Sequence, residues 1–324
     1  MSARPRVVVT RQLPAAVEEQ LAREFDAQLN RDDHPFTAGE LQDALRTADA
    51  VLPTVTDKLT ADVLSAEPLR ARILANYGVG FNHIDLGAAK GRGLVVTNTP
   101  DVLTDDTADD AILLMLMVAR RAGEGERHVR SRAWTGWRPT HMVGTKVSGK
   151  TLGMVGMGRI ARAAARRARL GFGMRVVFHD PYAPPPELVA ELGLESRSSV
   201  DDVVREADFL SLHCPATPET RHLMDARRFA LMQPTAFLIN TARGDVVDEA
   251  ALIAALRAGT IAGAALDVYE REPVVSPELL TMENVVLLPH LGSATRETRV
   301  AMGVRTLDNL RAFFSGATPR DRVA

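Results

Sequence analysis

Six residues at positions 156–161, GMGRIA, constrain the fold of this chain more than any other feature of its sequence. They follow an apolar run that predicts a strand at 151–156, and they open an amphipathic stretch that predicts a helix. In such a unit Gly156 permits a tight turn, Gly158 allows close approach to the backbone, and Ala161 lets helix and strand pack closely. The segment therefore predicts a Rossmann-type unit that binds a dinucleotide pyrophosphate at the helix N-terminus.

An acidic residue stands where such a unit would bind the ribose of the dinucleotide. The next predicted strand, 174–178, leads into Asp180, which lies 24 positions after Gly156. A carboxylate at this distance accepts hydrogen bonds from ribose hydroxyls and repels the additional phosphate of NADP. No arginine immediately follows Asp180 in the sequence, so we expect NAD(H) rather than NADP(H) as the cofactor. The alternative is that Asp180 only begins a turn before Pro181.

Short apolar runs alternate with amphipathic stretches along most of the chain, which is typical of parallel sheets covered by helices on both faces. The predicted strands are 6–9, 50–52, 73–76 and 94–97, and then 151–156, 174–178, 209–213, 236–240, 262–268 and 285–288. The length of 324 residues also exceeds the roughly 250–300 that one core usually holds. The expected fold class is α/β with two domains: a Rossmann-type doubly wound parallel sheet and a smaller flavodoxin-like α/β domain, with a cleft between them.

The chain is expected to leave the smaller domain and to return to it. A predicted helix at 105–121, acidic at its start and basic at its end, carries the chain across. A last helical stretch at 295–314 is too short to form a domain and is assigned to the first one. The predicted substrate-binding (catalytic) domain is therefore discontinuous, residues 1–100 and 289–324, and the dinucleotide-binding domain is residues 101–288.

Charge and composition exclude several classes of partner. A net charge of −2 gives no electrostatic basis for binding nucleic acid or an anionic membrane. The longest apolar run, 111–119, is far shorter than the ~20 residues that span a bilayer. The N-terminal residues lack the apolar stretch of a secretory signal and Cys214 is the single cysteine, so we expect a cytoplasmic location. The histidines lack metal-ligand spacing, and no metal is expected.

Three strands of the second series are predicted to end on polar or charged residues, among them Arg243, Glu272 and His290. Ligands of open parallel sheets bind beyond the carboxyl ends of the strands, so these residues should converge near the glycine turn. An imidazole beside a carboxylate can donate and accept a proton, and an arginine can bind a carboxylate through two parallel hydrogen bonds. Together with a nicotinamide, such a group of residues suits the reduction of a 2-oxo acid.

Six segments of the chain resemble, in order, the signatures of the D-isomer-specific 2-hydroxyacid dehydrogenases. They are NYGVGFNHID at 76–85, TNTPDVLT at 97–104, GMGRIA at 156–161, NTARG at 240–244, LDVYEREP at 266–273 and PHLGSAT at 289–295. The ordered set is highly specific and covers nearly the whole chain. A further segment, WTGWRP at 134–139, resembles the glyoxylate/hydroxypyruvate reductase branch of the family.

The resemblance implies a mechanism for particular side chains. Arg243 would bind the substrate carboxylate and carbonyl, His290 would donate a proton to the carbonyl oxygen, and Glu272 would keep that histidine protonated. The expected reaction is NAD-dependent reduction of a small 2-oxo acid, glyoxylate or hydroxypyruvate, to the D-2-hydroxy acid. The alternatives are a dehydrogenase of a bulkier D-2-hydroxy acid such as phosphoglycerate or lactate, and a non-enzymatic NADH-sensing binding protein that resembles a corepressor.

The remaining expected contacts fall into two groups. The expected substrate-binding residues are Val55, Val79, Gly80, Trp137, Arg243 and Ser293, and the expected cofactor-binding residues are Thr107, Gly156, Gly158, Arg159, Ile160, Asp180, His213, Thr241, Ala242 and Asp267. The resemblance implies that the backbone at Val79 and Gly80 meets the substrate carboxylate from the other domain. His213 is otherwise explained as a histidine that is satisfied at the end of its strand.

The resemblance also implies a homodimer that is built through the nucleotide-binding domains. In that dimer the loop around Trp137 would enter the active site of the neighbouring subunit. The alternative for Trp137 is an exposed aromatic side chain in a loop, and the sequence leaves both explanations open.

Overall fold

The computed structural model describes residues 4–182 and 184–324, and contacts divide the chain into two compact units. The first unit holds the chain up to Leu103 together with Ala294–Ala324, and the second unit is Thr104–Ser293. The predicted boundaries, after residue 100 and before residue 289, fall a few residues earlier than these divisions. The sequence-based division assigns His290 to the first domain, whereas the structure places it in the second unit with the glycine turn.

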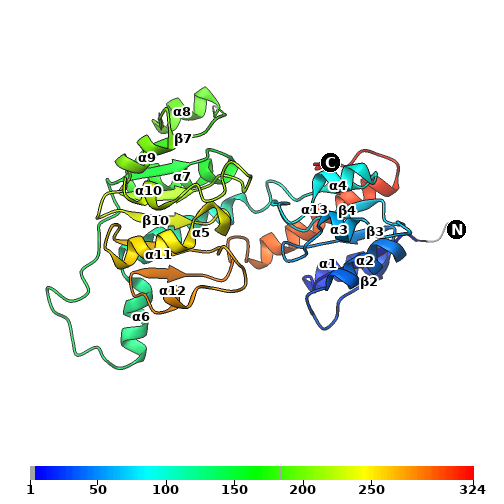
Figure 1. Cartoon of the computed structure of the whole chain (residues 1–324), viewed down its shortest axis with the longest axis horizontal. Helices are drawn as coiled ribbons and strands as arrows, with labels where there is room; N and C mark the ends of the chain where they lie inside the picture. The colour runs from blue at the N-terminus through cyan, green and yellow to red at the C-terminus, as the bar shows by residue number, and fades with distance from the viewer. Residues whose placement is uncertain (1–3, 183) are drawn as a thin grey trace. The chain divides into compact units, whose positions relative to one another are not determined.

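The first unit is built on a parallel sheet of five strands in the order β2-β1-β3-β4-β5 (Figure 1). This is the strand order of flavodoxin-like folds, as predicted. Its strands are β1 (Arg6–Val9), β2 (Asp26–Gln28), β3 (Ala50–Leu52), β4 (Ile73–Ala75) and β5 (Val95–Thr97), and its helices are α1 (Ala15–Glu24), α2 (Ala38–Thr47), α3 (Ala61–Leu64), α4 (Leu86–Gly91) and α13 (Arg296–Phe314).

The second unit is built on a parallel sheet of seven strands in the order β12-β11-β10-β9-β6-β7-β8. Its strands are β6 (Thr151–Val155), β7 (Arg175–His179), β8 (Glu195–Ser196), β9 (Phe209–Leu212), β10 (Phe237–Asn240), β11 (Gly263–Leu266) and β12 (Val285–Leu287). Its helices are α5 (Thr104–Ala119), α6 (Ala122–Arg130), α7 (Arg159–Phe172), α8 (Pro186–Leu192), α9 (Val200–Glu206), α10 (Ala226–Phe229), α11 (Glu249–Arg257) and α12 (Pro277–Leu280), with a 3₁₀ turn at Gly244–Val246. The strand order reverses between β6 and β9, which is where doubly wound sheets bind their ligands.

Alternate side chains of the seven-stranded sheet belong to two separate cores. Leu210 and Leu212 of β9 pack in one core with residues of α9, α10, α11 and α12. Phe209 of the same strand packs in the other core with residues of α5, α7 and α8. Successive residues of a strand point to opposite faces, so this division shows that helices cover both faces of the sheet. The doubly wound arrangement predicted from the alternating apolar runs is confirmed.

Glycines bound helix α7, and an arginine in a left-handed backbone conformation separates helix α5 from helix α6. Gly158 precedes α7 and Gly173 ends it with φ 60°, while small alanines form the buried face of the helix. The predicted helix at 105–121 ends earlier, at Ala119, because Arg121 adopts φ 54° and a new helix, α6, begins after it. Such a backbone conformation cannot continue a right-handed helix.

The segment that contains α6 extends away from the seven-stranded sheet (Figure 1). None of the described residues of α6 is buried, and the segment up to residue 146 is mostly exposed. Trp137, in this segment, has 81 % of its surface exposed. In the part of the chain that the structure describes, no helix is both long enough and apolar enough to cross a membrane.

Candidate functional site

The glycine turn lies between β6 and α7, beside the end of β9. Gly156 has φ 90°, and a Cβ atom on it would lie 2.8 Å from the His213 carbonyl carbon and from the Cys214 nitrogen. Only glycine fits this position, as the sequence pattern predicts. A Cβ on Gly158 would meet nothing within 4 Å, so the backbone there is open to a ligand. Arg159 and Ile160 form the first turn of α7, where the positive end of the helix dipole favours an anion.

Asp180 is bonded to the glycine turn. Its Oδ2 accepts a hydrogen bond of 2.5 Å from the Met157 N–H, and its Oδ1 accepts one of 2.7 Å from the Tyr182 N–H. The Gly156 N–H donates to the His179 carbonyl at 2.9 Å, which joins the turn to the end of β7 a second time. Asp180 therefore begins a turn before Pro181 and also bonds the end of β7 to the glycine turn.

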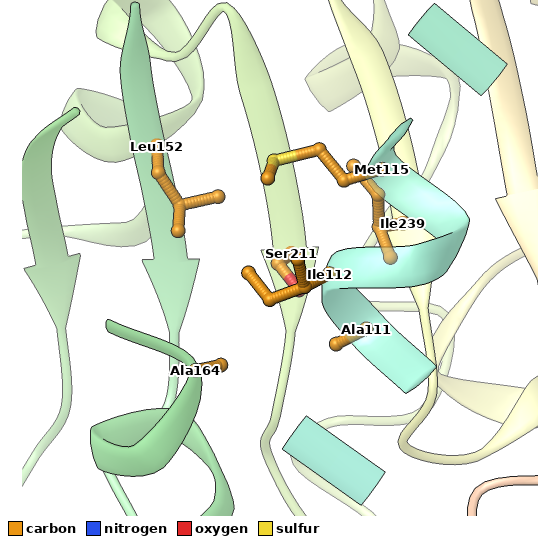
Figure 2. A pocket seen from close by; sticks show the side chains of 7 residues that line it. All are labelled: Ala111, Ile112, Met115, Leu152, Ala164, Ser211 and Ile239. Atoms are coloured by element: carbon orange, nitrogen blue, oxygen red, sulfur yellow. The ribbon is translucent and has the colours of Figure 1, made fainter. Parts of the chain in front are cut away.

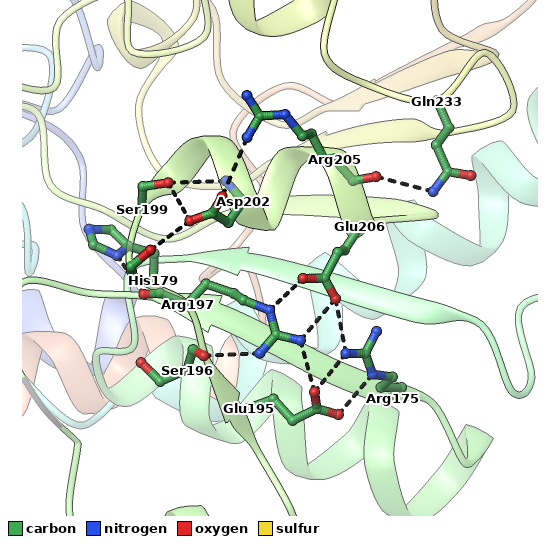
Figure 3. A network of polar contacts seen from close by, with 11 residues as sticks. Arg175, His179, Glu195, Ser196, Arg197, Ser199, Asp202, Arg205, Glu206 and Gln233 are labelled. Atoms are coloured by element: carbon green, nitrogen blue, oxygen red, sulfur yellow. Dashed lines mark hydrogen bonds and ion pairs between the residues drawn. The ribbon is translucent and has the colours of Figure 1, made fainter.

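Two arginines at the edge of the sheet, Arg175 at the start of β7 and Arg197 after β8, are bonded to carboxylates (Figure 3). Arg197 donates to Glu206 at 2.5 Å and to Glu195 at 2.8 Å, and Arg175 donates to the same two carboxylates. These hydrogen bonds, with Arg175 the larger contributor, lower the pKa of Glu195 to about 2. Both guanidinium groups are thus engaged within the edge of the sheet.

His213 is held at the end of β9 by a hydrogen bond between its Nε2 and Ser211 Oγ, 2.9 Å long. Burial lowers the pKa of His213 to about 4, so the ring is neutral at physiological pH. The hydrogen bond supports the view that this histidine is satisfied at its strand end, while its carbonyl lies against Gly156.

The ends of β10, β11 and β12 bring three of the expected residues into neighbouring loops. Asn240 sets the first loop, because its side chain accepts from the Ala242 N–H at 3.0 Å and donates to the Arg243 carbonyl at 2.9 Å. Arg243 is half-buried and donates from Nη1 to the Ala242 carbonyl at 2.6 Å. Burial lowers its pKa despite the nearby carboxylates of Glu272 and Asp245. Thr241, also in this loop, is buried.

His290 and Glu272 form an ion-pair contact, with 2.8 Å between Nδ1 and Oε2. Their side chains are 31 % and 32 % exposed, so the pair is accessible to a small ligand. The other Glu272 oxygen accepts from the Tyr269 N–H at 3.1 Å, which fixes the carboxylate. Burial raises the pKa of Glu272, but the hydrogen bond and charge of His290 outweigh burial and the pKa is lowered. An anionic carboxylate on Nδ1 leaves Nε2 of the imidazole for proton transfer.

The segment after His290 is held by Asp267, the residue that follows β11. The Asp267 carboxylate accepts from the N–H groups of Leu291, at 2.6 Å, and Gly292, at 2.8 Å. The Asp267 carbonyl accepts from the His290 N–H at 2.9 Å. Thr107, on α5, donates to the Gly292 carbonyl at 2.8 Å. Ser293 follows directly and is half-buried.

In the first unit, two asparagines hold the loop that contains Val79 and Gly80. Asn76 donates to the carbonyls of Gly78 and Gly80, each at 3.0 Å, and Asn98 donates to the Val79 carbonyl at 2.9 Å. Sequence reasoning missed both asparagines as supports of this loop, although each stands inside a quoted motif. Val55 follows β3 and is 37 % exposed.

A cavity in the second unit is a packing defect of the core. It measures about 10 Å³ and is lined by Ala111, Ile112, Met115, Leu152, Ala164, Ser211 and Ile239 (Figure 2). This volume holds at most about one water molecule, and its lining is almost wholly apolar. The cavity is therefore too small to hold a substrate or a dinucleotide.

Residues 112–292 match the sequence profile of a family described as "D-isomer specific 2-hydroxyacid dehydrogenase, NAD binding domain". The chain belongs to this family of dehydrogenases. The matched residues include the glycine turn, Asp180, Arg243, Glu272 and His290, and they cover most of the second unit. The second unit of this dehydrogenase is its NAD-binding domain, which confirms the family resemblance that the sequence motifs indicate.

Relatives of this dehydrogenase align over its whole length. Glyoxylate reductase from Thermococcus litoralis is 44 % identical over 324 residues, with 99 % of this chain and 97 % of the relative covered. Glyoxylate reductase from Thermococcus kodakarensis is 45 % identical, with 98 % and 95 % covered. A solved NADPH-dependent glyoxylate/hydroxypyruvate reductase from Sinorhizobium meliloti superposes with a TM-score of 0.88 at 36 % identity, with 99 % and 97 % covered.

A pair of glycine substitutions separates folding from dinucleotide binding in this dehydrogenase. We expect Gly156→Ala to lower the melting temperature, because φ 90° and the contacts with His213 and Cys214 strain any Cβ there. We expect Gly158→Ala to leave the melting temperature nearly unchanged but to weaken NADH binding by roughly 10-fold or more, because the methyl group blocks approach of the pyrophosphate. Thermal melts and fluorescence titration with NADH measure the two effects. Unchanged NADH affinity of Gly158→Ala would contradict this assignment of the turn.

Proposed function

We propose that this dehydrogenase reduces a small 2-oxo acid, glyoxylate or hydroxypyruvate, to the D-2-hydroxy acid with NADH. The observation that carries the proposal is the contact between His290 Nδ1 and Glu272, 2.8 Å long, in loops beside the loop of Arg243. The names of the similar reductases support the same substrate class. A carboxylate-bearing substrate with an adjacent carbonyl needs a cation for the first group and an acid for the second, and these residues supply both.

Each side chain has a separate task in the proposed reaction. The Arg243 guanidinium binds the carboxylate of the substrate and polarises its carbonyl. His290 gives the proton on Nε2 to the carbonyl oxygen while the carbonyl carbon accepts a hydride, which the nicotinamide supplies when it is bound. Glu272 orients the imidazole and stabilises its protonated form before the transfer. The product is the hydroxy acid, and the imidazole takes up a proton from solvent.

Further residues are assigned to binding. For the substrate we infer contributions from the backbone at Val79 and Gly80 and from Val55 and Ser293. For the cofactor we infer that Gly156, Gly158, Arg159 and Ile160 hold the pyrophosphate together with Thr107, that His213, Thr241 and Ala242 line the site, and that Asp267 lies near the carboxamide. The strain that any Cβ would cause at Gly156 and the open space at Gly158 fit a dinucleotide at this turn.

NADH is preferred over NADPH in this proposal. Asp180 is anchored beside the glycine turn, where its charge disfavours a 2′-phosphate. The backbone of Arg197 lies beside the end of β7, where its N–H donates to the Phe178 carbonyl, and its guanidinium group is already bonded to Glu195 and Glu206. A phosphate would have to compete with two carboxylates for it.

A homodimer through the NAD-binding domains completes the proposal. The α6 segment supports it, because Trp134 and Trp137 are largely exposed there and large apolar surface is typical of protein interfaces. In the dimer Trp137 would reach the neighbouring site. The proposed location is the cytoplasm, which a single buried cysteine suits. Light scattering of the purified chain and of Trp137→Ala tests the assembly, and a monomer at assay concentration would exclude it.

Steady-state oxidation of NADH and of NADPH by the purified protein tests the function. The panel contains glyoxylate, hydroxypyruvate, pyruvate and bulkier 2-oxo acids. We expect glyoxylate or hydroxypyruvate to be reduced fastest, with NADH preferred. Faster turnover of a bulky acid would favour the alternative dehydrogenase, and NADPH preference would overturn the role of Asp180. NADH binding without turnover of any acid would favour a sensing protein.

A further inference from the structure

A second carboxyl group lies beside Asp267 and comes from helix α5. Asp110 is 7 % exposed, and its side chain makes a hydrogen bond with the Asp267 carboxylate. Its Oδ2 is buried and accepts no hydrogen bond from an N–H or hydroxyl group of the described residues. Two carboxyl groups in hydrogen-bond contact must share a proton, because one of them has to donate.

Burial raises the pKa of both carboxyl groups, so their other hydrogen bonds identify which group holds the proton. Asp267 accepts two backbone N–H groups, from Leu291 and Gly292, and both of these hydrogen bonds favour its anionic form. Asp110 has no such donors among the described residues. Burial, and then the charge of Asp267, raise the pKa of Asp110 to about 7. Asp110 is thus the protonated partner below neutral pH.

The helix face that carries Asp110 also holds the segment after His290. Thr107 lies three positions before Asp110, on the same face of α5, and donates to the Gly292 carbonyl at 2.8 Å. The Asp267 carboxylate accepts from two successive N–H groups of the same segment, those of Leu291 and Gly292, and His290 itself has a strained φ of 57°. Backbone in this region persists only where its surroundings hold it in place.

We propose that Asp110 is a positioning residue for His290: it donates its carboxyl proton to Asp267, and Asp267 in turn fixes the backbone that carries the histidine. The shared proton also limits the pair to one negative charge beside the imidazole. The catalytic part of this inference rests on the proposed function, whereas the shared proton is a property of the folded chain alone.

Other charged and titratable groups around the pair are few. His290, after β12, faces both carboxyl groups, and Tyr269 faces Asp267. On the opposite side of α5, Arg167 of α7 is bonded to Asp105 and Asp109. Asp109 is therefore a matched control for Asp110, since it lies next to it on the same helix but is exposed.

The first test needs no enzyme activity. A carboxyl group whose pKa is raised in the folded chain binds its proton more tightly there, so its contribution to stability falls as pH rises from about 4 to about 7. Asp110→Asn keeps a hydrogen-bond donor to Asp267 and cannot ionise. We therefore expect its melting temperature to exceed that of the wild type by an amount that grows over this range to roughly 5 °C and then levels off. Asp109→Asn should show no such growth, and an Asp110→Asn curve parallel to the wild type would overturn the shared proton.

The second test separates positioning from a structural role. We expect Asp110→Ala to lower kcat for glyoxylate roughly 10-fold with little change in KM, and Asp110→Asn to restore kcat and to remove an ionisation near pH 7 from the rate profile. If the melting curves behave as expected but the rate profiles of Asp110→Asn and wild type coincide, Asp110 does not position His290. If no 2-oxo acid is reduced at all, the proposed function fails, while the melting curves still decide the shared proton.

Discussion

Replacement of His290 by asparagine is expected to lower kcat for glyoxylate reduction by roughly 10²–10⁴-fold, because the carbonyl oxygen then lacks a proton donor. Asparagine is the better substitute because it tolerates the φ of 57° at this position, whereas alanine adds backbone strain. Stopped-flow or steady-state NADH oxidation measures the loss, and NADH affinity should stay close to that of the wild type. A variant that retains full turnover would exclude His290 as the general acid.

A second histidine pair in the chain provides a matched control. His222 Nε2 lies 2.9 Å from Glu270, and the two side chains are 34 % and 21 % exposed, much like the pair of His290 and Glu272. His222→Asn removes an equivalent imidazole from a residue that also has a positive φ, and we expect it to leave kcat within about 3-fold. Equal losses in the two variants would indicate general destabilisation, which thermal melts would detect.

Substitution of Glu272 by glutamine distinguishes the orientation of the His290 imidazole by residue 272 from the effect of the negative charge of Glu272. The amide can still bond to the imidazole, but it lacks the anion that stabilises the protonated ring. The lowered pKa of Glu272 keeps that anion present through the neutral range in the wild type. The loss of turnover in Glu272→Gln should therefore be larger at neutral and alkaline pH than at acid pH.

Removal of Arg243 is expected to lower kcat/KM by roughly 10²–10³-fold, because a substrate carboxylate then loses its charge-assisted hydrogen bonds in a partly buried site. Arg243→Ala should affect both KM and kcat, since the same guanidinium binds the carboxylate and polarises the carbonyl. Arg243→Lys keeps the positive charge but loses the planar guanidinium group that makes two parallel hydrogen bonds. Its activity should lie between that of the wild type and that of Arg243→Ala.

The control for Arg243 is an exposed arginine of the same domain. Arg257 ends helix α11 and is exposed, so Arg257→Ala should retain wild-type kinetics. Oxamate, a carboxylate-bearing substrate mimic, should inhibit the wild type and Arg257→Ala but not Arg243→Ala. Inhibition of all three to the same degree would show that the carboxylate binds elsewhere.

The strands and helices could be predicted from the sequence wherever apolar residues recur with the spacing of a strand or a helix. Buried runs such as 209–213 and 236–240 identify central strands, since both faces of a parallel strand are covered. Strand β2, Asp26–Gln28, was missed because it is a three-residue polar edge strand without an apolar pattern. The end of the helix predicted at 105–121 lies close to the observed end at Ala119, but helix α6 was not predicted, because residue type does not show that Arg121 adopts a left-handed backbone conformation.

The site residues could be predicted from the sequence where the local backbone conformation itself requires a particular residue type. Gly156 is required by its φ and by the nearness of His213, and both follow from the strand-turn-helix unit. Asp110 was not predicted, because an acid near the start of a helix looks like an ordinary solvent-exposed side chain. Only the packing of α5 on the ends of the strands brings it to Asp267. The signal available in the sequence was its spacing of three from Thr107, which places both on one helix face.

The α6 segment also bears on how the chain loses its structure. Ordering a residue costs roughly 1–2 kcal/mol of conformational free energy, which burial elsewhere in the chain offsets. None of the described residues of α6 is fully buried, so little opposes the local opening of this helix. Limited proteolysis should therefore cut first between residues 122 and 146 (Figure 1), and the rate of that cleavage should fall as protein concentration rises if a second subunit covers the segment.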